Sequence, residues 1–303
     1  MISRCGLPKW VGLQRRKSPV DTKHRQCYDV CISAGAHIQS RGDETGMTHI
    51  HFLNGFTCCA RVPSNLQTGA LCLLLETGQG LVLVDTGLGR KDYTRQPAIL
   101  RIFRAVTIAP LDAEEAIVRQ IANLGYAPQD VRHIVLTHMH FDHCGGLPDF
   151  PDATVHVHRR EYEAFLGRPR AWMEVAYVRR HIAHQPRFEL YEDAGERWFD
   201  WPAIRLPFEP EMWLVQLFGH TRGHCGVAIR TASGWLFHSG DAEPVDFGGS
   251  LPGWMVRAVL GPHVQQLQEF RRAPPEVRRT TGHMPLGFFS TRGGDPVPGH
   301  LQA

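Results

Sequence analysis

Residues 136–146 read LTHMHFDHCGG and place three histidines and an aspartate within six positions: His138, His140, Asp142 and His143. Four polar side chains so close together are costly to bury unless each has a partner. Neutral imidazole nitrogens and carboxylate oxygens are donors that a borderline divalent cation binds well. The stretch therefore predicts a metal-binding segment.

Three further polar residues follow strand-like apolar runs, and each stands directly after a glycine. They are His220 in LFGHTRGHC, Asp241 in LFHSGDAEP and His283 in TTGHMP. Side chains at strand ends project from a rigid edge into loops, where binding sites are commonly built. The two sets together supply seven donors, whereas a structural zinc takes four. This number predicts two metal ions that share one carboxylate and keep an open position.

The HxHxDH spacing, followed in order by a histidine, an aspartate and a last histidine, resembles the metallo-β-lactamase-fold hydrolase superfamily over about residues 47–290. The resemblance implies an α/β (α+β) fold, a four-layer αβ/βα sandwich of two mixed sheets with helices outside. It also implies two divalent metal ions, zinc or alternatively manganese or iron. The implied ligands of the first ion are His138, His140 and His220. Those of the second are Asp142, His143 and His283, with Asp241 as the bridge.

Two other residues match motifs of the same family. Asp85, in VDTG, is expected to orient a ligand imidazole, and His224, in GHTRGH, is expected to support the site in a similar way. Among the ligands, the carboxylates Asp142 and Asp241 are the candidate catalytic residues. Two dications, two carboxylates and a bridging hydroxide leave about one positive charge, which lowers the pKa of bound water from 15.7 toward about 7. The expected reaction is attack of this hydroxide on an ester-like carbonyl.

Local sequence narrows the choice of substrate. A carboxylate at position 241 resembles lactonases, thioesterases of the glyoxalase II type and RNA-processing nucleases, whereas zinc β-lactamases typically lack it. The segments GHTRGH and HSGDA resemble N-acyl homoserine lactonases most, which implies a lactone substrate. Those lactonases commonly place a tyrosine three residues after the bridging aspartate, where this chain has Pro244.

Three alternatives remain open. A glyoxalase II-type thioesterase needs cationic side chains that bind a glutathione-like carboxylate. The chain offers Arg271, Arg272, Arg278 and Arg279 for this role. A solvated helix face is the simpler interpretation of these arginines. A persulfide dioxygenase with one iron leaves His143 and His283 without a role. A non-catalytic metal-binding module does not require all seven donors.

Composition sets further limits. The 303 residues are 43% hydrophobic and 21% charged, as in ordinary soluble proteins, and no apolar run is long enough for a membrane helix. Residues 1–46 carry eight Lys/Arg against four Asp/Glu, whereas residues 47–303 carry 25 against 26. We therefore predict a disordered extension over 1–46 and a hydrolase domain over 47–303 that has no basic surface for nucleic acid.

The cysteines and the charge balance bear on compartment and partners. The five cysteines after residue 46 form no CxxC pair and suggest no disulfide framework, which favours a reducing cytoplasm. The expected partner is a small-molecule substrate, with neither nucleic acid nor a membrane. The oligomeric state stays open, and a homodimer is one outcome that the sequence allows.

Hydrophobic periodicity predicts the elements around the site. Residues 70–89 are expected to form two buried strands, 90–111 a loop, 111–126 a helix capped by Asp112, 159–167 a helix and about 262–272 a last helix. The aromatic residues between 172 and 177 fit either a substrate wall or helix packing. The remaining histidines near these elements are interpreted as surface or packing residues, namely His133, His156, His158, His181, His184 and His238.

Overall fold

Strand β2 (Gln67–Thr77) is buried on both faces, and this pattern sets the architecture of the computed structural model. Leu71, Leu73 and Leu75 face the space between two sheets, whereas Cys72 and Leu74 face a layer of helices. Successive side chains of a strand point to opposite faces, so an apolar run without alternation must be covered on both sides. The structure describes residues 49–60, 67–170, 172–193, 195–243, 257, 259–263, 267 and 276–290.

The first sheet has eight strands among the described residues, in the order β4-β1-β2-β3-β5-β6-β7, with β14 paired to β2. Their bounds are β1 Ile50–Ala60, β3 Gly80–Val84, β4 Thr107–Ile108, β5 Val131–Val135, β6 Thr154–His158, β7 Arg187–Tyr191 and β14 His283–Pro285. Strands β3, β5, β6 and β7 run parallel, whereas β1, β2 and β3 alternate in direction. The carboxyl ends of β3 and β5 therefore meet at the same edge of the sheet.

The second sheet has six strands in the described part of the chain, in the order β13-β12-β11-β10-β9-β8. They are β8 Glu196–Trp198, β9 Trp201–Leu206, β10 Met212–Gln216, β11 Cys225–Thr231, β12 Gly234–His238 and β13 Val277–Thr280. Neighbours are antiparallel except β12 and β13, which are parallel. Because β12 and β13 end side by side, the residues that follow them are neighbours too.

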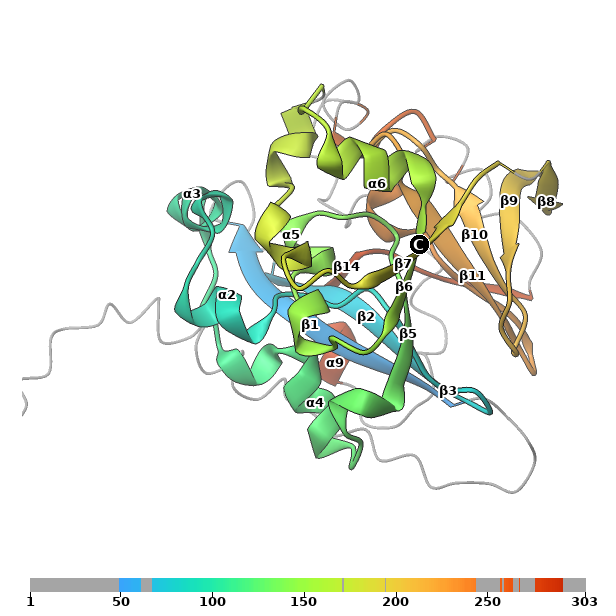
Figure 1. Ribbon diagram of the computed structural model, residues 1–303, viewed down its shortest axis with the longest axis horizontal. Coiled ribbons are helices and arrows are strands. Elements are labelled where there is room, and N and C mark those ends of the chain that lie inside the picture. Colours follow the sequence, from blue (N-terminus) through green and yellow to red (C-terminus); the bar gives the residue numbers. More distant parts are fainter. Residues whose placement is uncertain are drawn as a thin grey trace, which may run out of the picture.

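Helices cover the outer face of the first sheet (Figure 1). Ile117 and Ile121 of α4 and Phe165 of α6 pack against Leu74 and Leu83 of the sheet, and full burial of each such side chain contributes about 1.5–3 kcal/mol. The helices are α2 Arg90–Thr94, α3 Ala98–Val106, α4 Ile117–Asn123, α5 Phe141–Cys144, α6 Arg159–Leu166 and α9 Leu286–Ser290. Short 3-10 turns lie at Ala113–Glu115, Pro128–Asp130, Leu147–Asp149, Trp172–Ala176, Arg179–Ile182 and Gly240–Ala242.

The two mixed sheets expected from the sequence are confirmed, as are the hairpin of β2 and β3 and the helix α6. The loop expected over 90–111 was wrong, because α2 and α3 lie within it. The single helix expected over 111–126 was wrong at its start. A 3-10 turn, Ala113–Glu115, comes first and α4 follows, because Ala116 has ψ 126° and breaks the helix between them.

Some of the segments predicted from the sequence lie outside the residues that the structure describes. The last helix, about 262–272, lies mostly outside the described residues, as do residues 1–46 and Pro244. Arg278 and Arg279 belong to strand β13 and not to a helix face. None of the helices in the described part is both long and apolar enough to cross a membrane.

Candidate metal centre

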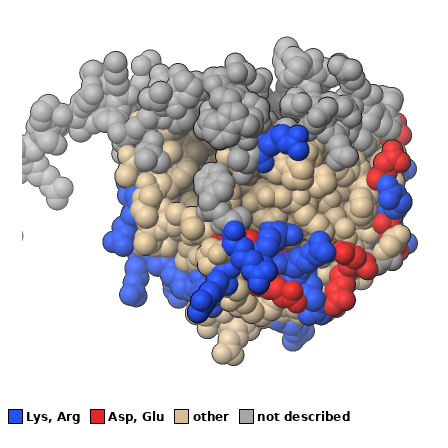
Figure 2. Space-filling model, turned by 90° about the horizontal axis from the view of Figure 1, so that it is seen from above, with Lys and Arg blue, Asp and Glu red and all other residues tan. Residues whose placement is uncertain are grey.

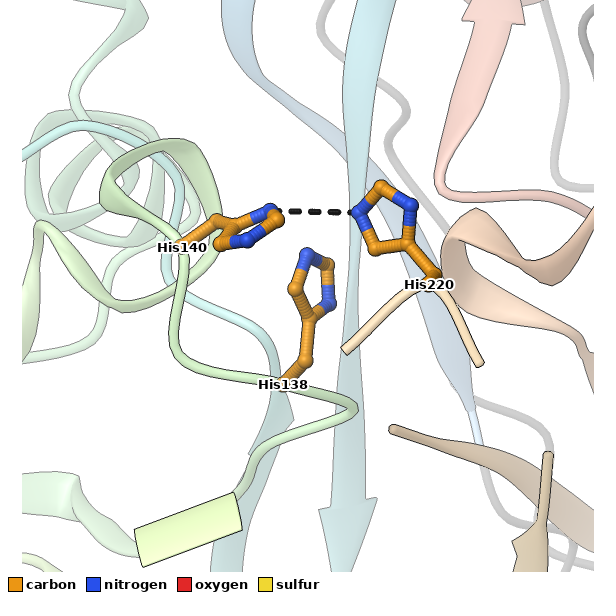
Figure 3. A group of neighbouring side chains, drawn as sticks. All are labelled: His138, His140 and His220. Atoms are coloured by element: carbon orange, nitrogen blue, oxygen red, sulfur yellow. Dashed lines mark hydrogen bonds between the residues drawn. The ribbon is translucent and has the colours of Figure 1, made fainter. Parts of the chain in front are cut away.

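Three histidines converge at the edge where β5 ends. His138 and His140 lie in the segment after β5, and His220 lies in the loop before β11, so the two sheets each contribute (Figure 3). The Nδ1 atom of His140 and the Nε2 atom of His220 are 3.1 Å apart. The ring of His138 lies 4.5 Å from that of His140 and 4.9 Å from that of His220, centroid to centroid. All three side chains are buried.

In the rings of His220 and His138, the nitrogen that points away from the cluster makes a hydrogen bond. This hydrogen bond determines which ring nitrogen carries the unprotonated lone pair. His220 Nδ1 donates to the carbonyl of Val259 at 2.7 Å, so its Nε2 carries the lone pair. The Thr137 hydroxyl donates its one proton to Asp85 Oδ2 at 2.7 Å and therefore accepts from His138 Nδ1 at 3.0 Å. The Nε2 of His138 is thus also unprotonated. Both lone pairs are available to one cation.

A second group lies beside the first and is richer in carboxylates. The Nε2 of His283 lies 3.4 Å from Asp142 Oδ2 and 3.5 Å from Asp241 Oδ2. The Nε2 of His143 lies 3.5 Å from Asp241 Oδ1. Three triplets of side chains each bring their donor atoms within 4.8 Å of one another. They are His138–His140–His220, His138–His143–Asp241 and Asp142–His143–His283.

Asp241 stands between the two groups. Its Oδ2 lies 3.4 Å from His220 Nε2 and 3.9 Å from His138 Nε2, while its Oδ1 faces His143. The preceding Gly240 has φ +55°, a conformation that favours glycine. The backbone N–H of Asp241 donates to His224 Nε2 at 3.0 Å. These constraints place one carboxylate within reach of both groups, as the sequence predicted for the bridge.

Asp85 behaves as the sequence predicted for an orienting residue. Its carboxylate accepts from His143 Nδ1 at 2.9 Å, from the Thr137 backbone N–H at 2.9 Å and from the Thr137 hydroxyl. Burial raises the pKa of Asp85, but the charges and hydrogen bonds of His143 and His238 outweigh it and lower the pKa to about 2. The negative charge on Asp85 therefore holds the proton of His143 on Nδ1 and leaves Nε2 facing the cluster.

The electrostatics divide the site into two halves. Burial lowers the pKa of His138 and of His140 well below the ordinary value, so both rings are neutral. Burial also opposes the charge on His143, but Asp241, Asp142 and Asp85 outweigh it and raise its pKa to about 10. The pKa of His283 is raised well above its usual range by Asp241 and Asp142 against the same burial penalty. The acidic half attracts positive charge.

Several donor atoms of the cluster lack any hydrogen-bond partner within the described part of the chain. They include the buried Nε2 atoms of His138 and His143 and the Oδ1 of Asp241. An unsatisfied buried polar atom costs about 1–3 kcal/mol. Divalent metal ions would satisfy these atoms at once, and imidazole with carboxylate is a donor set that zinc, manganese or iron accepts. The residues present therefore fit a metal centre.

One important residue of the site was missed by the sequence analysis. Glu161 of α6 is fully buried and accepts hydrogen bonds from Met139 and Gly223, which lie in the two ligand-bearing loops. A signal was present, since Glu161 shares the apolar face of its helix with Ala164 and Phe165, three and four positions on. An acid on such a face is rarely buried without partners.

The histidines interpreted as surface or packing residues lie outside the donor groups found among the described residues. Most still have a polar partner. His133 Nδ1 is 3.0 Å from His156 Nε2, and His156 Nδ1 is 2.9 Å from the Tyr191 hydroxyl. The other pairs are His158 with Asp193, His181 with Asp92 and His238 with Thr280. Tyr177 packs its ring 5.5 Å from that of His140, so this aromatic residue supports a ligand.

The chain belongs to the metallo-β-lactamase superfamily, whose family model matches residues 67–283. Among its relatives are proteins of Mycobacterium bovis and Mycobacterium tuberculosis, each named "Probable metallo-hydrolase". Each is 41% identical over 253 residues, which cover 80% of this chain and 78% of the relative. An N-acyl homoserine lactonase of Bacillus thuringiensis is 32% identical over 161 residues, 53% of this chain and 58% of that protein.

Solved structures agree with the fold. An N-acyl homoserine lactone hydrolase, solved with N-hexanoyl-L-homoserine bound at its catalytic metal centre, has a TM-score of 0.60 and 24% identity and covers 79% of this chain and 94% of its own. A dizinc quorum-quenching lactonase has a TM-score of 0.54 and 16% identity, with coverage of 81% and 91%. The metallo-β-lactamase fold predicted from the sequence is confirmed.

Proposed function

We propose that this chain is a dinuclear metal-dependent hydrolase that opens lactones, with N-acyl homoserine lactones as the substrate class. The observation that carries the dinuclear site is the place of Asp241, whose carboxylate lies within 4 Å of ring nitrogens from both groups of histidines. His138, His140 and His220 would hold one metal ion, and Asp142, His143 and His283 the other. Bound there, the ions would supply hydroxide at neutral pH and polarise a carbonyl.

The exposure of the candidate ligands supports substrate entry from one side. The side chains of His138, His143 and His220 are at most 2% exposed, whereas those of Asp142 and His283 are 13% and 22% exposed. A lactone carbonyl therefore enters on the side of Asp142 and His283. Hydrolysis breaks the ring C–O bond and leaves an alcohol that needs one proton. That proton comes from the hydroxide that attacks the carbonyl, and the Asp142 carboxylate, on the open side, would relay it to the alcohol oxygen.

An aromatic cluster beside the ligands supports an acylated substrate. Phe141, between His140 and Asp142 in the chain, packs against Phe56 and against Phe103 of α3, with centroid distances of 6.4 and 6.1 Å. Ile102 of the same helix is 64% exposed. Because Phe56 and Phe141 are buried, the partly exposed Phe103 and the exposed Ile102 are the apolar surface that α3 offers to the alkyl chain of an N-acyl group.

Two observations weigh against other substrates. Arg279, a candidate grip for a glutathione-like carboxylate, already pairs with the buried Glu243 at 2.5 Å. On the face shown in Figure 2, Lys and Arg gather toward one edge with Asp and Glu beside them. A mixed edge favours a small-molecule substrate over a polyanion. The lactonase relative from Bacillus thuringiensis points the same way.

The test combines metal content with a hydrolysis panel. Protein purified without chelator is analysed by mass spectrometry for metals and assayed on N-acyl homoserine lactones, simple lactones, a glutathione thioester and a cephalosporin. We expect about two metal ions per chain and turnover of acyl lactones. Turnover of the thioester alone would replace the proposed substrate class but would agree with the proposed metal centre. One iron without hydrolysis, or no metal, would contradict the proposal.

A further inference from the structure

A single buried carboxylate joins the two loops that carry the three-histidine group. Glu161, the third residue of α6, is fully buried. Its Oε1 accepts from the backbone N–H of Met139 at 2.8 Å and from the Tyr177 hydroxyl at 3.0 Å. Its Oε2 accepts from the Thr221 hydroxyl at 2.6 Å and from the backbone N–H of Gly223 at 3.2 Å.

The partners of Glu161 are neighbours of metal ligands in the chain. Met139 lies between His138 and His140, and Thr221 directly follows His220. The first turn of α6 also lies against the second loop, because a Cβ added at Gly223 would come within 2.1 Å of the Glu161 backbone nitrogen. None of the four hydrogen bonds to the Glu161 carboxylate comes from Asp142, His143, Asp241 or His283.

The chemistry of these four bonds requires a carboxylate. Two partners are backbone N–H groups, which can only donate, so both oxygens must accept. A glutamine would turn its NH₂ toward one of those N–H groups and leave that donor unpaired in the interior. Burial raises the pKa of Glu161, and the four donors act against that rise. Hydrogen bonds from these four donors therefore oppose the cost of burying this carboxylate.

We propose that Glu161 is a positioning residue that sets the distance between the two loops and thereby the affinity of the His138–His140–His220 position for metal. The inference rests on the proposed metal centre and assigns Glu161 to one of its two positions. Because two loops from different sheets must be held in register to bring three rings together, loosening them costs affinity at that position. Residues that orient ligands from behind commonly contribute 10- to 100-fold in metal affinity.

The experiment uses two variant backgrounds, each of which retains one of the two proposed metal-binding positions. His283→Ala retains the three-histidine position, and His220→Ala retains the other. Each metal-free protein is titrated with Co²⁺ and followed by its visible absorption, with and without Glu161→Gln. We expect Glu161→Gln to weaken Co²⁺ binding about 10- to 100-fold in the His283→Ala background and less than 2-fold in the His220→Ala background. Glu163→Gln, an exposed acid on the same helix, is the matched control and should change neither.

The outcomes separate this inference from the proposed function. Equal Co²⁺ affinity with and without Glu161→Gln, or an equal loss in both backgrounds, would overturn the positioning role. If the wild-type protein takes up no Co²⁺, the result contradicts the proposed metal centre itself. Should Glu161→Gln fail to fold by circular dichroism, Thr221→Val removes one hydroxyl donor and keeps the carboxylate. It is then expected to weaken only the three-histidine position, and an unchanged affinity there would overturn the inference.

Discussion

The carboxylate of Asp241 lies within 4 Å of ring nitrogens from four histidines, His138, His143, His220 and His283. No other side chain in the described residues appears in ion pairs with members of both the three-histidine group and the acidic group. Burial raises the pKa of Asp241, but His283 and His143 outweigh it and lower the pKa well below its usual range. The Asp241 carboxylate is therefore ionised at neutral pH.

Replacing that charge separates a bridging role from a packing role. Asp241→Asn keeps the volume and the backbone contact with His224 but removes the charge that two cations would share. We expect about one metal ion per chain in place of two and turnover reduced roughly 100- to 1,000-fold. Metal analysis and lactone assays measure both, with the exposed Asp152→Asn as the control. Unchanged activity in Asp241→Asn would count against a bridged pair.

Gly282 permits the close approach of the last ligand loop. A Cβ at this position would lie 2.1 Å from Asp241 Oδ1 and 3.1 Å from a ring carbon of His143. Gly282→Ala is therefore expected to displace the carboxylate and cut turnover at least 10-fold, while the protein stays folded. Gly78→Ala is the control, because nothing lies within 4 Å of its added Cβ. A fully active Gly282→Ala protein would show that turnover does not depend on the present position of the Asp241 carboxylate.

At this scale the residues predicted as metal ligands do lie close together, whereas most of the residues that support them were not predicted. The HxHxDH spacing is local, so His138, His140, Asp142 and His143 could be found without a fold. For Glu161 the helix pattern indicates burial, but not its four partners, which come from three separate segments that only tertiary packing brings together. Asp85 was found through its motif, whereas its hydrogen bonds to Thr137 were not.

Among the elements, the segment 111–126 shows how a tertiary contact overrides a local pattern. A capping box predicted one continuous helix, with Glu115 reaching back toward Asp112. Glu115 instead accepts from the backbone N–H of Thr57 in β1 at 2.9 Å. The chain then breaks at Ala116 before α4 begins. The helices α2 and α3 were missed for a related reason, since short helices draw their stability from packing more than from propensity.

The same Glu115 gives a pH-dependent prediction. Burial raises its pKa from 4.5 to about 7, against the hydrogen bonds from Thr57. The folded protein binds this proton more tightly than the unfolded chain, so stability is lost as the pH rises from 4.5 through 7. Glu115→Gln keeps an oxygen for Thr57 and should raise the free energy of unfolding by about 1–3 kcal/mol at pH 8 and by nearly nothing at pH 4.

Urea unfolding of both proteins at each pH measures that difference, and other titrating groups cancel when the two are subtracted. Glu114→Gln is the matched control, since the Glu114 side chain is 68% exposed. A difference between Glu115→Gln and wild type that is the same at pH 4 and pH 8 would show that Glu115 titrates normally.

On the scale of the whole molecule, the candidate metal centre draws its residues from both sheets. His140 and Asp142 follow a strand of the first sheet, whereas His220 and Asp241 adjoin strands of the second. Ions bound between them would resist separation of the sheets, and a ligand at 1,000 times its Kd stabilises a fold by about 4 kcal/mol. We expect a chelator to lower Tm by roughly 10 °C and added Zn²⁺ to restore it. Calorimetry checks this, and an unchanged Tm after verified metal removal would contradict it.

Strand β14, which begins with the ligand His283, pairs with the early strand β2, where His283 lies opposite Ala70. The segment that completes the acidic half of the centre is thus among the last parts of the domain to leave the ribosome. The three-histidine group draws on residues up to His220, whereas the acidic group also draws on His283. In the proposed two-metal site, a chain cut before β14 would therefore keep the three-histidine group and lose His283 from the acidic group.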